Sequence, residues 1–326
     1  MEIVIEQTLQ KLSENYDEWN KRYETYLKEI WQNEGKSNKA FRKPLNLSLY
    51  STVGTRNEKC YFLRFKGQNV GKITVSNSKE VKLNSLVAPG KFHELGDCPI
   101  LKGHEAVEWH SEEAFNFRHY FKHKEESTKT KSPEHFIENR LLIEFRQRNG
   151  RIKQIRNIQP VLLHELFFQM PTPLKASDHV PKYSGKNGGG IDIISRIRTK
   201  EGHIRLCVME VKDENEEKET QKNAMSQAII YATFIAKLIE VQKDWLKFFS
   251  GHHRRSGKLS NSLDAKDIEV VTIMPIGGTE TFDKKDLSVM GTDYVLHCRT
   301  LYYDKHKFEN DNIFEFSGSL LEDIKL

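Results

Sequence analysis

The sequence contains little cysteine and no long apolar segment. Only four of its 326 residues are cysteines, and they lie far apart with no CxxC pair. That spacing suits reduced thiols in a cytoplasmic protein better than a disulfide framework. No run of about 18 apolar residues occurs, and the N-terminus turns acidic where a signal peptide would be basic and then apolar. We therefore expect a soluble cytoplasmic protein with no membrane association.

The sequence also lacks a nucleotide-binding loop and a strong excess of charge of one sign. No G-x-x-x-x-G-K-[ST] motif occurs, so the chain has no ATP motor of its own. With 51 basic and 46 acidic residues, the net charge of +5 permits attraction to phosphate without identifying a partner. Basic stretches at 118–131 and 252–258 lie near predicted loops, and each taken singly is better explained as solvated surface.

The first 130 residues show two different periodicities. Apolar and aromatic positions recur at helical spacing over residues 3–31, which predicts one or two amphipathic helices. Alternation over residues 45–87 predicts a small antiparallel sheet, and a helical pattern follows at 103–121. The polar, lysine-rich segment 122–132 marks the expected linker. We predict a mainly β N-terminal module over residues 1–130 that carries a leading helix.

The second region has the mixed elements of an α/β domain. Ser132 and Pro133 suit the N-cap and the first position of a helix. Further predicted elements are a β-rich stretch at 158–170, a two-stranded hairpin at 191–212, a long helix at 223–242 and a strand at 269–276. This order predicts an α/β domain over residues 131–326 in which helices flank a sheet.

The strand IRLCVMEVK places an acid and a lysine side by side. Because side chains alternate along a strand, Glu210 and Lys212 share a face and follow two apolar residues. Burying such charges is costly unless they are paired or bind a metal, so the strand end is either an ion pair at the rim or a ligand site. The Glu-x-Lys pattern alone decides nothing, because it recurs at 34–36, 80–82 and 216–218 without an apolar strand before it.

Asp192 distinguishes Glu210 and Lys212 from those repeats. A hairpin turning at 199–203 has arms of equal length and would bring Asp192 beside Glu210. Two carboxylates at close range are costly unless a cation sits between them, and Mg²⁺ is held by one or two carboxylates with open water positions. The glycines GGG before Asp192 would let a bulky polyanion approach, although a plain flexible turn explains them equally well.

The following helix adds two polar side chains. Gln227 and Tyr231 are one turn apart and share a face, so they are expected to flank the acidic site. The alternative is an ordinary polar edge on a core helix.

The combination of GGGID, a hairpin, MEVK and Gln-Ala-x-x-Tyr-Ala over residues 227–232 resembles the PD-(D/E)XK nuclease superfamily, in particular its RecB-like branch. The resemblance covers residues 132–276 and implies a restriction-endonuclease-like mixed sheet flanked by helices. It implies that Asp192 and Glu210 bind Mg²⁺, for which Mn²⁺ can substitute. It also implies that Lys212 helps to activate or position the attacking water, and that Gln227 and Tyr231 support the site. The family also places an acid on the preceding helix. Glu138 is the predicted third metal ligand, with Glu134 one turn earlier on the same side.

These observations favour a Mg²⁺-dependent nuclease, and they favour DNA over RNA as the nucleic acid that it is expected to cleave. The N-terminal module would recognise the substrate or a protein partner, or form a homodimer. A binding protein of the same fold that does not cleave remains the second hypothesis, and a purely structural α/β protein the third. A zinc site at His93, Cys98, His104 and His110 is disfavoured, because the spacing matches no known closed site.

Overall fold

The computed structural model describes residues 1–32, 48–51, 59–65, 68–75, 80–85, 106–123, 133–146, 152–163, 166–176, 178–185, 188–216, 219–251, 263–264, 266–278, 282–311 and 313–324. This part of the chain is a mixed α/β structure that divides into two compact units. Unit 1 comprises Met1–Leu27, Leu141–Val161 and Met170–Leu326, and unit 2 comprises Lys28–Arg140 and Leu162–Gln169.

Unit 2 is built on a mostly antiparallel sheet. The described strands have the order β5-β4-β3-β2-β1-β8-β7, and β1 and β8 run parallel. Their bounds are Ser48–Ser51 (β1), Lys59–Phe65 (β2), Gln68–Val75 (β3), Val81–Ser85 (β4), Val107–Glu108 (β5), Leu162–Leu163 (β7) and Leu166–Phe168 (β8). Helix α3 (Glu112–His123) contributes Phe117 and Phe121 to a core shared with apolar side chains of β2, β3 and β4. The antiparallel sheet expected for residues 45–87 is therefore confirmed.

The helix of unit 2 begins later than its sequence pattern predicts. The pattern starts at residue 103, whereas α3 begins at Glu112. Residues Val107–Glu108 instead pair with β4 as strand β5. An edge of the sheet offers backbone hydrogen bonds that a local helical pattern does not reveal.

Unit 1 contains a mixed sheet in the order β14-β15-β13-β12-β11-β6, with β16 also paired to β15. Strands β12, β13 and β15 are mutually parallel, and the other pairs are antiparallel. The bounds are Ile158–Pro160 (β6), Ile193–Arg198 (β11), Ile204–Val211 (β12), Asp267–Pro275 (β13), Lys285–Ser288 (β14), Val295–Tyr303 (β15) and Phe316–Ser317 (β16). A separate antiparallel pair is formed by β9 (Leu174–Lys175) and β10 (Lys182–Tyr183).

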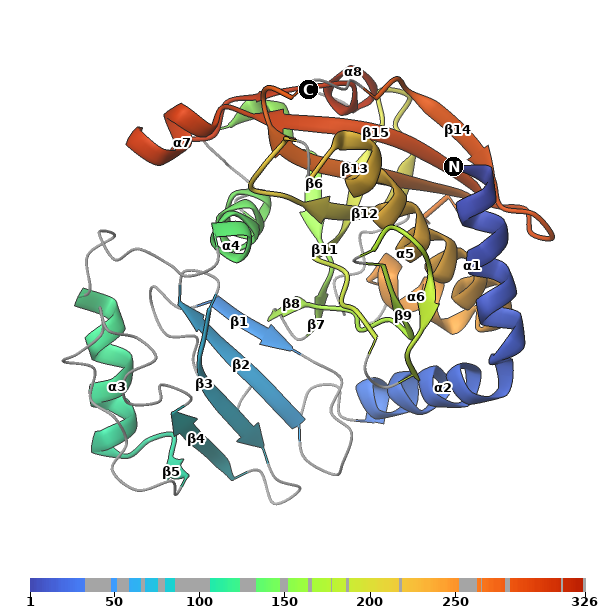
Figure 1. Cartoon of the computed structure of the whole chain (residues 1–326). Coiled ribbons are helices and arrows are strands. Elements are labelled where there is room, and N and C mark those ends of the chain that lie inside the picture. The colour runs from blue at the N-terminus through green and yellow to red at the C-terminus, as the bar shows by residue number, and fades with distance from the viewer. Residues whose placement is uncertain are drawn as a thin grey trace. The chain divides into compact units, whose positions relative to one another are not determined.

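Helices accompany this sheet. They are α1 (Glu2–Glu14), α2 (Tyr16–Gln32), α4 (Pro133–Arg146), α5 (Gln221–Val241), α6 (Asp244–Ser250), α7 (Lys305–Asp311) and α8 (Leu320–Asp323), with a 3-10 turn at Lys153–Ile155. The long helix α5 lies against β12, β13 and β15, as Figure 1 shows for unit 1. The predicted α/β character, with helices against a sheet, is therefore confirmed.

The structure divides the chain differently from the boundary predicted at residue 130. Residues 1–27 belong to unit 1, because α1 and α2 pack on α5: the rings of Trp19 and Tyr23 lie 6.0 and 4.9 Å from that of Phe234. Residues 162–169 belong to unit 2 through the pairing of β8 with β1. Both departures come from contacts between segments that are remote in sequence.

Helix α5 is the central helix of unit 1. Thr220 caps its first turn by accepting a hydrogen bond from Asn223 N–H. Within the described chain it is also the one helix long and apolar enough to cross a membrane by composition, but 78% of its apolar window is buried inside the structure. That burial is what the core helix of a folded domain requires.

Candidate metal centre

The hairpin β11–β12 brings Asp192 beside Glu210. The register runs from Arg198↔Ile204 to Ile193↔Met209, so Asp192 and Glu210 are the next residues beyond the paired ones and lie opposite each other. The turn lies at the predicted place, where Thr199 N–H donates to the carbonyl of His203 at 2.9 Å and Gly202 has a φ of 92°. Asp192 Oδ2 also accepts from Val211 N–H at 2.9 Å, which fixes the carboxylate over the end of β12.

Lys212 forms a buried ion pair with Glu210. The Nζ atom donates to Glu210 Oε1 at 2.8 Å, and the two residues are only 6% and 1% exposed. The backbone of Lys212 is held by neighbouring strands, because its N–H donates to Ile273 O at 2.9 Å and its carbonyl accepts from the Tyr303 hydroxyl at 3.3 Å. The acid and the lysine predicted to share a face therefore do so, in a site with little exposure to water.

A third carboxylate comes from helix α4. One oxygen each of Glu134, Asp192 and Glu210 lies within 4.8 Å of the other two. Helix α4 is one continuous helix, and the division between the units falls inside it. Its residues Leu141–Arg146 belong to unit 1. These three carboxylates could hold a metal ion.

The third acid differs from the one expected. The sequence predicted Glu138, whereas the acidic group contains Glu134, one helical turn earlier. Glu138 is buried, and one of its carboxylate oxygens lies 3.3 Å from Nδ1 of His135. The two glutamates are one helical turn apart on the same face of α4, and Glu138 as a metal ligand stays a prediction.

Tyr231 and Gln227 lie next to the acidic group, as predicted. Burial, and then the negative charge of Glu210, raises the pKa of the Tyr231 hydroxyl, while a hydrogen bond with Gln227 opposes this. Asp192 and Lys212 also act on the pKa of Tyr231 through their charges. The phenol therefore stays protonated and able to donate a hydrogen bond at neutral pH.

The glycines before Asp192 serve close packing within the protein. A Cβ on Gly188 would lie 1.9 Å from the carbonyl oxygen of Thr172, and one on Gly189 would lie 2.4 Å from the Tyr231 hydroxyl. Gly189 N–H donates to Leu174 O at 2.7 Å, which ties the loop to β9. This packing accounts for both residues without the approach of a polyanion.

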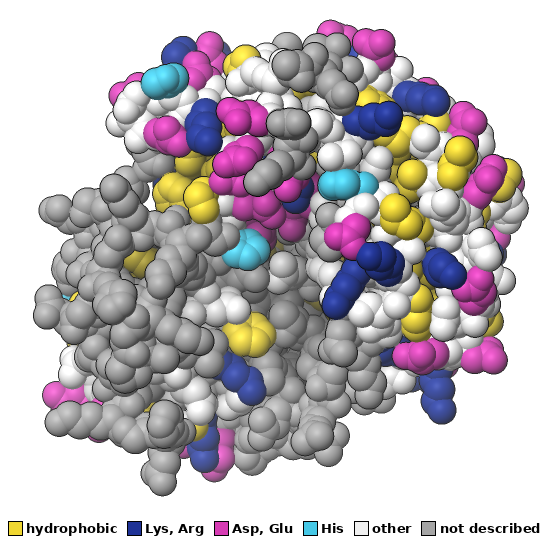
Figure 2. Space-filling model, viewed as in Figure 1, with side chains coloured by type: hydrophobic (Ala, Val, Ile, Leu, Met, Phe, Trp, Pro, Cys, Tyr) yellow, Lys and Arg dark blue, Asp and Glu magenta, His cyan; other side chains and the backbone are white. Residues whose placement is uncertain are grey.

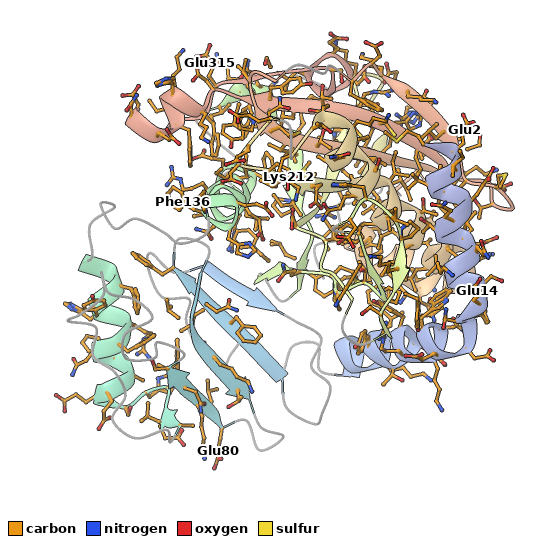
Figure 3. The ribbon with its side chains drawn as sticks, viewed as in Figure 1. Glu2, Glu14, Glu80, Phe136, Lys212 and Glu315 are labelled. Carbon is orange, nitrogen blue, oxygen red and sulfur yellow. The ribbon has the colours of Figure 1, made fainter. Side chains whose placement is uncertain are left out.

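The donor set suits a hard divalent cation. All of the candidate ligand atoms are carboxylate oxygens, which Mg²⁺ and Mn²⁺ prefer, and no histidine or cysteine belongs to the described group. In Figure 2 acidic side chains gather with a basic one at the place where Figure 3 labels Lys212, at the end of β12. The residues present therefore fit a Mg²⁺ or Mn²⁺ ion.

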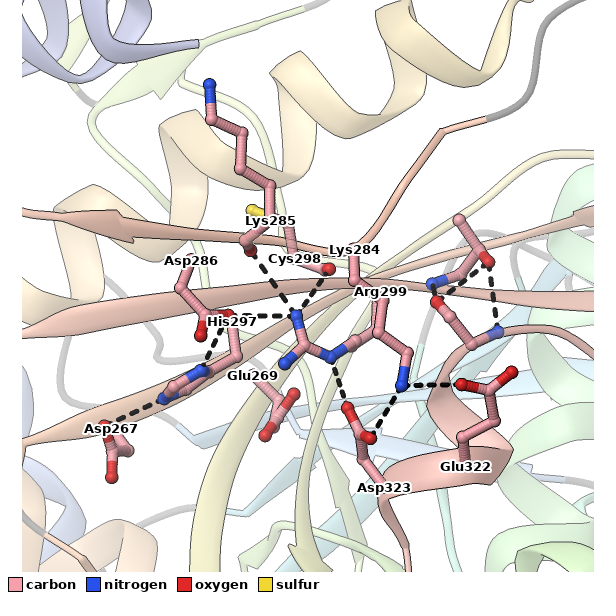
Figure 4. A network of polar contacts seen from close by, with 12 residues as sticks. Asp267, Glu269, Lys284, Lys285, Asp286, His297, Cys298, Arg299, Glu322 and Asp323 are labelled. Atoms are coloured by element: carbon pink, nitrogen blue, oxygen red, sulfur yellow. Dashed lines mark hydrogen bonds and ion pairs between the residues drawn. The ribbon is translucent and has the colours of Figure 1, made fainter.

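A second charged cluster lies on the same sheet, toward the amino ends of β13 and β15 (Figure 4). His297 bridges two acids, with Nε2 2.9 Å from Asp267 Oδ1 and Nδ1 3.0 Å from Asp286 Oδ1. Arg299 contacts Asp286 at 3.0 Å and also pairs with Asp323. In this cluster each acid contacts a histidine, arginine or lysine side chain of the protein itself.

Burial tends to raise the pKa of both Asp286 and Asp323. The hydrogen bonds and charges of their partners outweigh it and hold the pKa of each carboxyl below its ordinary value. These partners are His297 and Arg299 for Asp286, and Lys284 and Arg299 for Asp323. Both acids therefore stay ionised within the network at neutral pH.

Four sequence features lie wholly or mostly outside the described residues. These are the predicted linker 122–132, the basic stretches 118–131 and 252–258, and the disfavoured zinc set, of which His110 alone is described. The sequence placed Glu134 on the same face as Glu138 without choosing it for the acidic group, and it gave no sign of Tyr303, whose hydroxyl donates to the Lys212 carbonyl. The shared face was the available signal for Glu134, whereas nothing local identifies Tyr303.

The chain matches no family model, no curated protein and no solved structure. The site is therefore interpreted from its own geometry.

Proposed function

We propose that the protein is a metal-dependent nuclease that hydrolyses phosphodiester bonds, with DNA as the preferred substrate. The convergence of Asp192, Glu210 and Glu134 carboxylates within 4.8 Å, beside the buried Lys212, carries this proposal. Like charges gathered in a site of low exposure repel one another unless a cation joins them. Such a centre beside a lysine is suited to a substrate that is itself an anion.

A bound Mg²⁺ or Mn²⁺ would polarise the scissile phosphate and lower the pKa of an attacking water. Asp192 and Glu210 would hold the ion, and Glu134 would complete the carboxylate set. Lys212 contributes its positive charge where negative charge develops on the phosphate. Tyr231, kept protonated by burial and by Glu210, donates a hydrogen bond at the edge of the site, and Gln227 orients it.

We further propose that unit 1 has the restriction-endonuclease-like fold of the PD-(D/E)XK superfamily. The order α4, hairpin β11–β12, α5 and parallel strand β13 supports this proposal. Unit 2 would then recognise the substrate, a protein partner or a second copy of the chain.

A cleavage assay tests the proposed function. Purified protein is incubated with Mg²⁺ or Mn²⁺ and with plasmid, linear duplex, single-stranded DNA and RNA, and compared with Asp192→Ala and Lys212→Ala. We expect the wild type to cleave, chelation of the metal to stop cleavage, and both variants to be inactive. If no substrate is cleaved, or if both variants cleave as well as the wild type, the nuclease proposal is wrong. Binding of nucleic acid without cleavage would favour a catalytically silent binding module instead.

A further inference from the structure

The amide of Gln221 contacts Thr272, the strand neighbour of Glu210, and has no role in the function proposed above. Gln221 is the first residue of α5 and is 1% exposed. Its Nε2 donates to the hydroxyl of Thr272 on β13. Thr272 is the residue directly opposite Glu210 in the parallel pair β12–β13. Opposite residues point to the same side of a sheet and lie about 4.8 Å apart, so the threonine that the amide contacts is a close neighbour of Glu210.

One polar atom of this amide is left over. Within the part of the chain that the structure describes, Gln221 Oε1 is buried and has no hydrogen-bond partner. A threonine hydroxyl donates as well as accepts, so turning the amide over would leave Nε2 without a partner instead. Burying such an atom without a hydrogen-bond partner is unfavourable. Ordered water is the usual partner of a buried polar atom that the protein does not satisfy.

The position of Gln221 favours a water that belongs to the metal centre. Mg²⁺ keeps several waters when only a few carboxylates hold it, so hydrogen-bonding groups around the ligands matter. The first turn of α5 also directs unsatisfied backbone N–H groups and a partial positive charge toward this end of the helix. A water here would meet an amide, a hydroxyl and the Glu210 carboxylate.

We propose that Gln221 is a positioning residue of the metal centre. Its free amide atom holds a water against the Glu210 carboxylate and thereby strengthens the binding of a cation by Asp192 and Glu210. The proposal rests on the proposed metal centre and names a residue that the nuclease resemblance does not include.

Calorimetric titration of the metal-free protein with Mn²⁺ tests this role without any measurement of cleavage. We expect Gln221→Leu to weaken Mn²⁺ binding by about tenfold or more, as the loss of an outer-shell partner does. Gln221→Glu keeps the shape and adds a negative charge, so it should tighten Mn²⁺ binding. Thr233→Val is the matched control: its Oγ1 is also buried on α5 without a described partner. It lies 12 residues further along the helix, about 18 Å away, and should bind Mn²⁺ as the wild type does.

Thermal unfolding with and without Mn²⁺ keeps the test decisive if Gln221→Leu is unstable. The stabilisation by Mn²⁺ should then be larger in Gln221→Glu than in the wild type. Wild-type affinity in both Gln221 variants would overturn the role of Gln221 and leave the metal centre standing. Failure of the wild type to bind Mn²⁺ would overturn the metal centre and this inference together.

Discussion

The sheet of unit 1 carries two charged clusters that are built in opposite ways. At the carboxyl end of β12, Glu210 and Asp192 converge with Glu134, and Lys212 is the cationic side chain beside them. Near the amino ends of β13 and β15, the acids pair with His297, Arg299 and Arg205. Each acid of the second cluster pairs with a basic side chain of the protein, whereas the first cluster brings three acids together beside Lys212.

The difference indicates which cluster is built for a ligand. A network in which every acid has a basic partner ties strands together, while converging carboxylates gain from an added cation. Position agrees with this distinction, because open α/β sheets bind their ligands at the carboxyl ends of strands. We therefore propose a structural role for the network of Figure 4 and a binding role for the acids near Lys212.

The largest expected effect separates two buried glutamates on neighbouring strands. Glu210→Gln should reduce cleavage by about 100-fold or more, because loss of an outer-shell partner alone costs roughly 10–100-fold. Glu269→Gln, at a position that is 0% exposed and paired with Arg205 at 2.7 Å, should leave cleavage per folded molecule unchanged. Initial rates normalised to folded protein measure both. Equal losses in the two variants would remove the distinction between the clusters.

Removing Lys212 should leave the acids of the first cluster with less positive charge beside them. Lys212→Met leaves the buried Glu210 carboxylate without its lysine, and breaking a buried pair costs about 3–5 kcal/mol. Mn²⁺ should recover more stability in this variant than in the wild type, because the ion supplies the missing charge. Chemical denaturation with and without Mn²⁺ measures this. Lys247→Met, from an exposed pair with Asp244, is the control and should change stability little in either condition.

Comparing the Mn²⁺ affinities of variants at two glutamates on α4 tests which of them belongs to the proposed metal centre. Glu134→Gln should weaken Mn²⁺ binding by about tenfold or more, on the scale of lost metal-site partners. Glu138→Gln should leave Mn²⁺ affinity unchanged, because its carboxylate faces His135 and is absent from the acidic group. Calorimetric titration of both variants decides between them. A larger loss in Glu138→Gln would restore the ligand that the sequence predicted.

The smallest expected effect concerns the stability that the second charged cluster contributes at low pH. The folded-state pKa values of Asp286 and Asp323 lie below their ordinary value of 3.8, so both acids stabilise the fold above that pH. This stabilisation should be lost as the pH falls below about 4 toward the folded-state values. The loss should be modest, since the side chain of Asp286 is 54% exposed and its charge is screened. Thermal unfolding between pH 5 and 3 measures it, and Arg299→Met should flatten the dependence. An unchanged slope would show that the network does not hold these acids ionised.

The sequence by itself determined the local elements of the site and much of its composition. Alternation along residues 204–211 and the equal arms around the turn at 199–203 were enough to place Asp192 opposite Glu210. Helical spacing was enough to place Gln227 and Tyr231 on one face. These features follow from periods of two and 3.6 residues, which are properties of neighbouring residues in the chain.

The tertiary structure alone decided the rest. It grouped residues 1–27 with the α/β unit, put β15 beside β13, and brought Glu134 into the acidic group. It also placed Thr272, which Gln221 contacts, opposite Glu210. Each of these outcomes depends on packing between segments far apart in sequence. A periodic pattern identifies the face of an element but not its neighbour or the depth at which a particular turn is packed.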